Sequence, residues 1–181
     1  MCTSLKDSTI IVTLQNGVES DEVVASRFGW HRVVPAVVYV GATVDEPGVV
    51  THAAPAGMSI GARPGFDALR LDGLRDVLAA SGQPVQISID IQRERWRKLM
   101  WNASFNTVSA MTMRAPGELL AMPDTRALLR RLMQEVVDVA RASGIGLVDA
   151  DVDKSHRVDR AALGHAHVDD GRSVARSDDG S

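Results

Sequence analysis

The sequence predicts an α/β portion over residues 1–90, followed by an all-α portion over residues 91–153. Two observations predict this division. Short runs rich in β-branched residues, bounded by Gly, Pro and Asn, recur as far as about residue 90. Beyond that point, apolar residues recur every three or four positions, as on the buried face of a helix. Residues 154–181 are crowded with Asp and Arg and carry few large apolar side chains, so we predict a disordered tail there.

The α/β portion is predicted to alternate strands, turns and helices. Its strands are expected over residues 9–14, 33–44, 49–52, 58–62 and 84–89, and its helices over residues 19–27 and 66–81. Asn16-Gly17 forms a turn after the first strand, because both residues tolerate positive φ. Glu46-Pro47-Gly48 folds the next two strands into a hairpin.

The all-α portion begins with one long helix over residues 91–111. A short helix is expected from Pro116, because proline is tolerated in the first helical turn. Asp124 is the candidate N-cap of a further helix that ends at Ser143 before Gly144. One face of this helix is apolar and carries Leu128, Leu132, Val136, Val139 and Ala140.

The long helix carries a polar stripe made of Lys98, Asn102 and Asn106. Residues four apart lie on one helix face, each offset by about 40° from the last. Most of the surrounding residues are apolar or aromatic, so the stripe needs a reason, and one reason is a site that grips and protonates a small polar ligand. The alternative is a solvated stripe on an ordinary amphipathic helix, and the spacing alone favours this alternative.

Composition excludes several classes of partner. Lys and Arg total 20 against 23 Asp and Glu, for a net charge of −3, and no basic block stands out. We therefore expect neither a nucleic-acid partner nor a membrane partner. The single cysteine, Cys2, cannot form an internal disulfide and fits the reducing cytoplasm. No apolar run reaches the length of a membrane span, and we see no export signal.

Several motifs, taken together and in order, resemble the ketopantoate reductase (2-dehydropantoate 2-reductase) family over residues 8–153. They are Leu14-Gln15-Asn16-Gly17-Val18-Glu19, Glu46-Pro47-Gly48, Trp96-Arg97-Lys98-Leu99 with Asn102 and Asn106, and Pro116-Gly117-Glu118-Leu119. The resemblance implies the C-terminal part of a doubly wound dinucleotide-binding domain, followed by an incomplete all-α substrate domain. It also implies NADPH-dependent reduction of 2-dehydropantoate to pantoate in pantothenate biosynthesis, with NADP as cofactor, a small 2-keto acid as substrate and a homodimer as the assembly.

The resemblance assigns roles to four residues. Lys98 matches the general acid that hydrogen-bonds the keto oxygen of the substrate and supplies a proton to it. Asn102 and Asn106 match the asparagines that hold the hydroxyl and carboxylate end of the substrate. Asn16 matches the asparagine near the nicotinamide ribose.

Other polar and aromatic residues are interpreted more simply. Trp96 and Trp101 are expected to pack rather than to bind substrate, and His52 is expected to be a surface residue. No metal site is predicted, because His156, His165 and His167 have mixed spacing and no acidic or cysteine partner at known positions.

The sequence departs from the family pattern at both ends. It contains no G-x-G-x-x-G loop for a dinucleotide, so we expect a truncated chain with weak or no activity. A His-Thr-Ser-Met segment expected after Asp153 is absent, although codons for residues 166–170 can spell it one base later. The hypothesis is a frameshift near Lys154, which the nucleotide sequence decides. Two alternative functions remain: a related 2-keto acid reductase, and a non-catalytic helical interaction module that uses Leu128, Leu132 and Val136.

Overall fold

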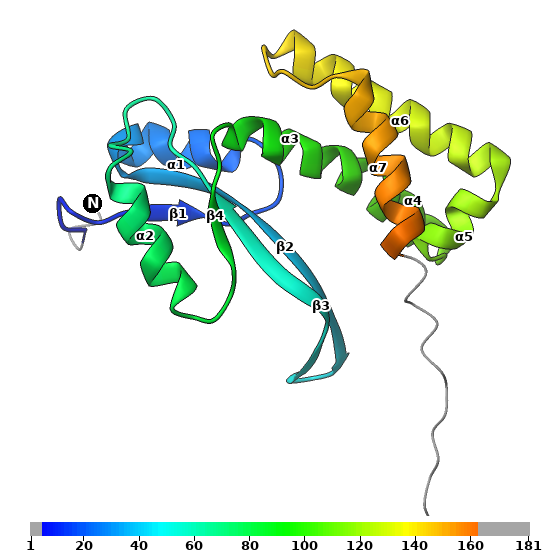
Figure 1. The fold of residues 1–181 in the computed structure, drawn as a ribbon, viewed down its shortest axis with the longest axis horizontal. Coiled ribbons are helices and arrows are strands. Elements are labelled where there is room, and N and C mark those ends of the chain that lie inside the picture. Colours follow the sequence, from blue (N-terminus) through cyan, green and yellow to red (C-terminus); the bar gives the residue numbers. More distant parts are fainter. Residues whose placement is uncertain (1–4, 163–181) are drawn as a thin grey trace, which may run out of the picture.

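The computed structural model describes residues 5–162 of the chain. A sheet with flanking helices forms one part and a group of helices forms the other (Figure 1). Helix α3 (Ile91–Trp101) leads from the first part into the second. The change from sheet to helices falls at Asp90, whose carboxylate caps α3 by accepting a 3.0 Å hydrogen bond from the Arg93 N–H.

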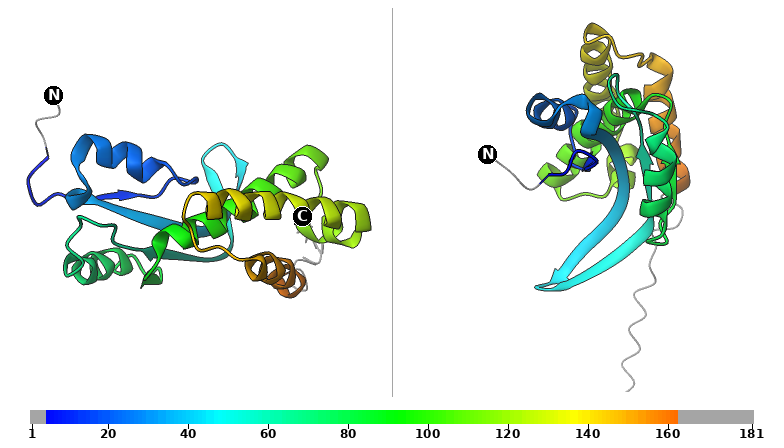
Figure 2. Two further views of the ribbon diagram at one scale, coloured as in Figure 1. Left: turned by 90° about the horizontal axis from the view of Figure 1, so that it is seen from above. Right: turned by 90° about the vertical axis from the view of Figure 1, so that its left-hand side faces the viewer.

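The sheet contains four strands in the order β1-β2-β3-β4. They are β1 (Ile11–Thr13), β2 (Val33–Glu46), β3 (Val49–Ile60) and β4 (Val85–Ile87). The β1/β2 and β3/β4 pairs are parallel, whereas β2 and β3 form an antiparallel hairpin that projects from the body (Figure 1). Helices α1 (Ser20–Phe28) and α2 (Arg70–Ala79) cover opposite faces of this mixed sheet (Figure 2). A 3₁₀ turn, Trp30–Arg32, leads from α1 into β2.

Two of the predicted strands are one strand. Residues 49–52 and 58–62 were predicted separately, but β3 runs unbroken from Val49 to Ile60. It pairs with β2 over nearly its whole length, so backbone hydrogen bonds to the preceding strand of the hairpin hold the intervening residues extended. The outer strands are shorter than predicted, and α2 begins at Arg70 rather than near residue 66.

The sheet packs closely against the start of α3. A Cβ added at Gly61, just after β3, would lie 2.6 Å from the Cβ of Ile91. Only glycine therefore fits at this contact. Ile60 and Ile91 are buried on either side of it, which fixes the helix that carries Lys98 against the sheet.

The helical part continues from α3 through a five-residue π-helical turn, η2 (Asn102–Asn106). Its remaining helices are α4 (Thr107–Thr112), α5 (Pro116–Ala121), α6 (Pro123–Ala142) and α7 (Asp149–Ala162). Met100, Phe105, Leu119, Leu129 and Met133 are fully buried in its core. The predicted helix over residues 91–111 is thus continuous in the structure but contains one π turn.

Two predictions about α6, its first residue and its buried face, differ from the structure by one or two positions along the helix. Its N-cap is Met122, with Pro123 in the first turn, so Asp124 lies inside the helix and does not cap it. The buried face carries Leu129, Met133, Val137 and Ala140, next to the predicted stripe. Of that stripe, Ala140 is buried and Leu132 and Val136 pack partly against the core, whereas Leu128 and Val139 are exposed. Two neighbouring faces are apolar, and packing against the rest of the helical part decides which one is buried.

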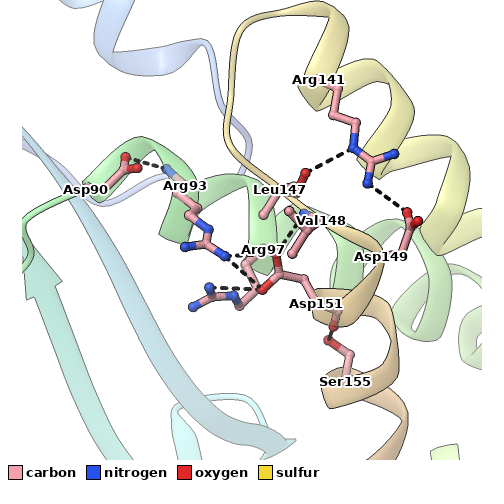
Figure 3. Close-up of polar contacts among 9 residues, drawn as sticks. All are labelled: Asp90, Arg93, Arg97, Arg141, Leu147, Val148, Asp149, Asp151 and Ser155. Atoms are coloured by element: carbon pink, nitrogen blue, oxygen red, sulfur yellow. Dashed lines mark hydrogen bonds and ion pairs between the residues drawn. The ribbon is translucent and has the colours of Figure 1, made fainter.

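Helix α7 extends beyond the predicted end of ordered structure. It runs on to Ala162, past Lys154, where the predicted disordered tail begins, and the tail itself stays a prediction. Figure 3 shows how Asp151 joins the start of α7 to α3: its buried carboxylate accepts bonds from Arg93 (3.1 Å) and Arg97 (3.2 Å) on α3. These contacts come from a distant helix, so the local composition did not reveal them. Residues 163–181, with His165 and His167, lie outside the described residues, and the frameshift stays a prediction.

Two classes of feature are not found within residues 5–162. No helix there combines the length and apolarity needed to cross a membrane. The same residues contain no group of three or more His, Cys, Asp or Glu side chains that could hold a metal ion.

Candidate active site

A cleft lies where the end of β1, the middle of β2 and helix α3 meet. It contains about 240 Å³ of empty space, part of which is open to solvent. Its walls are residues 14–17 after β1, residues 36–38 of β2, and Arg95, Lys98, Leu99 and Asn102. The structure thus brings Asn16, Lys98 and Asn102 together from segments that are about eighty residues apart in the sequence.

Lys98 approaches the cleft from α3 and contacts β2. Its Nζ donates a hydrogen bond to the Val38 carbonyl and lies 5.8 Å from the centre of the Tyr39 ring. Burial disfavours the charged ammonium and lowers the pKa of Lys98 below its ordinary value of 10.5. A lysine with a lowered pKa gives up its proton more readily, which suits a general acid.

All three asparagines of the chain belong to this region. Asn16 and Asn102 line the cleft directly. Asn106 is exposed and is not part of the wall, but its Nδ2 donates a 2.9 Å hydrogen bond to Asn102 Oδ1. The structure therefore links Asn106 to the cleft through Asn102.

The π turn changes how the polar stripe is aligned. In an α-helix each step of four residues overshoots a full turn by about 40°. A π turn contains more residues, so a step of four falls short of a full turn. The step from Lys98 to Asn102 and the step from Asn102 to Asn106 consequently rotate in opposite senses, and the three side chains remain in line. Single π turns often occur at functional sites, and no feature of the sequence predicted this one.

Sequence reasoning missed two buried charges beside the cleft. Arg95 is 3% exposed and forms an ion pair with Asp21, which is completely buried. Arg95 Nη2 also donates to the Gly17 carbonyl at 3.1 Å and to Ser20 Oγ at 2.9 Å. A charged pair that spans the fold has no local sequence signal, because either residue alone is typical of a helix surface.

The two tryptophans of the long helix pack as predicted. Trp96 and Trp101 lie against the core of the helical part. Trp101 stacks on Phe105 with ring centres 4.3 Å apart. Both rings therefore support the helix that carries the polar stripe.

Comparison with known proteins identifies the family. The family model described as "Ketopantoate reductase PanE/ApbA" matches residues 3–65, and the model described as "Ketopantoate reductase PanE/ApbA C terminal" matches residues 90–170. The chain belongs to the ketopantoate reductase family. The C-terminal match continues past Lys154, where the frameshift was predicted.

Among curated relatives, a 2-dehydropantoate 2-reductase of Mesorhizobium japonicum is 30% identical over an alignment that covers 78% of this chain and 49% of that protein. The ketopantoate reductase chain spans about half the length of the curated relatives it matches.

Solved structures agree with the predicted fold. The 2-dehydropantoate 2-reductase of Geobacter metallireducens is 31% identical, with a TM-score of 0.79 over 87% of this chain and 53% of that one. A dimeric ketopantoate reductase from Staphylococcus aureus is 26% identical, with a TM-score of 0.69 over 83% of this chain and 49% of that one. D-mandelate dehydrogenase with NADH and anilino(oxo)acetate is 18% identical and shares the fold, with a TM-score of 0.77 over 85% of this chain and 50% of that one. The ketopantoate reductase chain thus has a Rossmann-like α/β part followed by a helical part, as predicted.

Proposed function

We propose that the cleft binds a 2-keto acid and serves the NADPH-dependent reduction of 2-dehydropantoate to pantoate, a step of pantothenate biosynthesis. One observation carries the proposal: an amine and two carboxamides, from Lys98, Asn16 and Asn102, line the same cleft. The relatives named 2-dehydropantoate 2-reductase support this choice of substrate.

Each residue has a role that fits its chemistry. The Lys98 ammonium hydrogen-bonds the keto oxygen, stabilises the negative charge that grows there and transfers a proton to it. Asn102 binds the hydroxyl and carboxylate end, because a carboxamide offers donors and an acceptor without a charge of its own, and Asn106 acts there through its hydrogen bond to Asn102. Asn16 contacts both the substrate and the nicotinamide ribose.

The residues at the end of β1 fit one end of the cofactor. Asn16 and Gly17 follow the carboxyl end of a strand paired in parallel, where ligands bind in doubly wound sheets. Gly17 has a φ of 96°, and nothing lies within 4 Å of where its Cβ would be, so the turn has open space beside it. NADPH, when bound, supplies the hydride. The pyrophosphate end of the cofactor has no glycine-rich loop to hold it in these 181 residues, so we expect slow turnover by this chain alone.

Binding therefore tests the proposal more sharply than turnover. Protein labelled with ¹⁵N-asparagine contains only three asparagines, all at the site, and is titrated with 2-dehydropantoate. We expect the side-chain signals of Asn16 and Asn102 to shift at saturation, and Lys98→Ala to weaken binding at least tenfold. Lys154→Ala, on an exposed position of α7, is the matched control and leaves binding unchanged.

Two results would count against this function. One is the absence of any shift at a saturating concentration of 2-dehydropantoate. The other is equal weakening by Lys98→Ala and Lys154→Ala. NADPH consumption is followed in parallel by absorbance, and rapid turnover would contradict the need for a glycine-rich loop.

A different 2-keto acid is the second candidate substrate. The side chains in the cleft recognise the shared keto and carboxylate groups, and a protein of the same fold was solved with anilino(oxo)acetate. Titration with several 2-keto acids separates the candidates, because the true substrate shows the lowest Kd.

The assembly and location are further parts of the proposal. We propose a homodimer, supported by the dimeric relative from Staphylococcus aureus, and a cytoplasmic location, supported by the single cysteine. The interaction module stays the alternative: of its three residues, Leu128 is exposed, whereas Leu132 and Val136 pack partly against the helical core. Light scattering of the purified chain distinguishes a dimer from a monomer.

A further inference from the structure

Arg95 connects two of the three segments that form the cleft, helix α3 and the turn after β1. It lies on α3, and its guanidinium contacts the Gly17 carbonyl in that turn, and the Ser20 hydroxyl and the Asp21 carboxylate at the start of α1. Arg95 and Asp21 are both buried. A planar guanidinium with donors in fixed directions sets both the distance and the orientation of the groups it binds.

The same helix face carries the arginine and the site residues. Arg95, Lys98 and Asn102 are spaced i, i+3 and i+7, so they project in similar directions from α3 and η2. At the other end of its contacts, Arg95 binds the carbonyl of Gly17, the residue directly after Asn16. One side chain thus joins the backbone beside Asn16 to the helix that carries Lys98 and Asn102.

The start of α1 depends on these contacts. Glu19 is the N-cap residue, and its side chain makes no capping hydrogen bond. Asp21, in the first turn of α1, is held by Arg95 and also accepts a 2.7 Å bond from Gln92 Nε2 on α3. Helix α3 therefore supplies the closest polar partners of this end of α1, and Arg63, after β3, adds longer ion pairs to Asp21 (3.6 Å) and Glu22 (3.7 Å).

We propose that Arg95 is a positioning residue, which holds Asn16 opposite Lys98 and Asn102 and is itself oriented by Asp21. The position of the Asn16 turn relative to α3 can be measured without a ligand. The effect of Arg95 on substrate recognition, in contrast, rests on the proposed function.

The first experiment measures the position without a ligand. Spin labels are placed on exposed residues of α1 and α4 by Val23→Cys and Met111→Cys, with Cys2→Ser removing the native cysteine. We expect a narrow distance distribution with Arg95 present and a broader one in Arg95→Met. Arg93→Met is the matched control, because Arg93 lies on the same helix but pairs with Asp151, and it leaves the distribution narrow.

Conservative variants keep this test decisive. Arg95→Lys retains a charge for Asp21 but loses the fork of donors. We therefore expect a distance distribution whose width lies between those found with Arg95 and with Arg95→Met. Should Arg95→Met fail to fold, Ser20→Ala and Asp21→Asn each weaken one contact and are expected to broaden the distribution less. An unchanged distribution in folded Arg95→Met, or in both of the milder variants, overturns the proposal.

The second experiment measures coupling in the binding of 2-dehydropantoate. Asn16→Ala and Asn102→Ala are combined in a double-mutant cycle, once with Arg95 and once with Arg95→Met. With Arg95 present, we expect the change in Kd of the double variant to differ at least threefold from the product of the two single-variant changes. In Arg95→Met, we expect the change in the double variant to equal that product. A purely structural role would lower the stability of the fold and leave the coupling unchanged, which would overturn the proposal. If the unmodified chain binds no 2-dehydropantoate, the proposed function fails, while the spin-label distances still decide the role of Arg95.

Discussion

Asn106 Nδ2 donates a 2.9 Å hydrogen bond to Asn102 Oδ1 across the π turn. This bond engages the amide oxygen of Asn102, so the NH₂ group of Asn102 supplies the donors that a ligand in the cleft can use. Asn102 lines the cleft, and Asn106 stands outside the wall. Asn102 thus presents donors to the cleft, which suits the carboxylate or hydroxyl oxygens of a keto acid.

Asn106→Ala tests this orientation. Without its partner, the Asn102 amide is free to rotate and should lose about one hydrogen bond to the ligand, so that the Kd for 2-dehydropantoate rises about tenfold. The free energy of unfolding should change by less than about 0.5 kcal/mol, since the Asn106 side chain is exposed. Titration calorimetry and urea unfolding measure the two quantities. Gln83→Ala, an exposed amide outside the cleft, is the control, and equal affinities for the two variants would refute the role of Asn106.

Deletion of Ala103 tests the π turn itself. A π turn contains one residue more than an α turn, so the deletion should convert it into an α turn while the helices on either side keep their buried faces. Asn106 would then follow Asn102 by three positions, and the bond between them should be lost. We expect at least a tenfold rise in the Kd for 2-dehydropantoate with helical circular dichroism retained. Ala103→Ser keeps the length and is the control; unchanged affinity after the deletion would show that the π turn does not align the stripe.

The lowered pKa of Lys98 predicts a pH dependence. The protonated amine is the acid, so activity should fall as pH rises through a pKa below 10.5. Stability changes in the opposite sense: the unfolded chain binds more protons between the folded and unfolded pKa values, so stability rises with pH across that interval. Labelling of lysine with ¹³C at Cε gives three signals, from Lys6, Lys98 and Lys154. A titration of Lys98 at or above 10.5 would contradict the burial of its ammonium.

Asp151 predicts a second pH dependence, which concerns stability alone. Burial raises the pKa of its carboxyl, but the Val148 N–H and the guanidinium groups of Arg93 and Arg97 outweigh burial and lower it below 3.8. The carboxylate therefore stabilises the fold above the unfolded pKa, and this contribution is lost as pH falls through the lowered folded value. Asp151→Asn should cost about 2 kcal/mol at pH 7, because hydrogen bonds to a charged, buried acceptor are lost.

Urea unfolding at several pH values measures this effect, with Asp153→Asn as the control. Asp153 lies two residues away and forms an ion pair with Arg130 at 2.7 Å, but its side chain is 44% exposed. The control should change stability by about 0.5 kcal/mol or less. The difference in the free energy of unfolding between the wild type and Asp151→Asn should become smaller below pH 3.8. A difference that is constant with pH would contradict an ionic role for Asp151.

Local sequence patterns predicted most of the helices and strands because each pattern reflects contacts made within a few residues. The turn at Asn16-Gly17, the helix that carries Lys98 and the start of a helix at Pro116 are all present. The errors lie where packing or pairing between segments decides the outcome. β3 is continuous because β2 pairs with it. Helix α6 buries Leu129 and Met133 completely, packs Leu132 partly against the helical core and leaves Leu128 exposed.

The sequence by itself determined the steps of four residues that bring one amine and two carboxamides to one face of a predicted helix, because that spacing is local. The π turn that keeps the three in line appeared only in the structure. Tertiary structure alone decided that this face meets the Asn16 turn in a cleft, and that Arg95 and Asp21 join the two sides. These relations depend on how α3 packs against β1, β2 and α1. Such packing is the sum of many contacts between segments far apart in the sequence, and no local pattern encodes it.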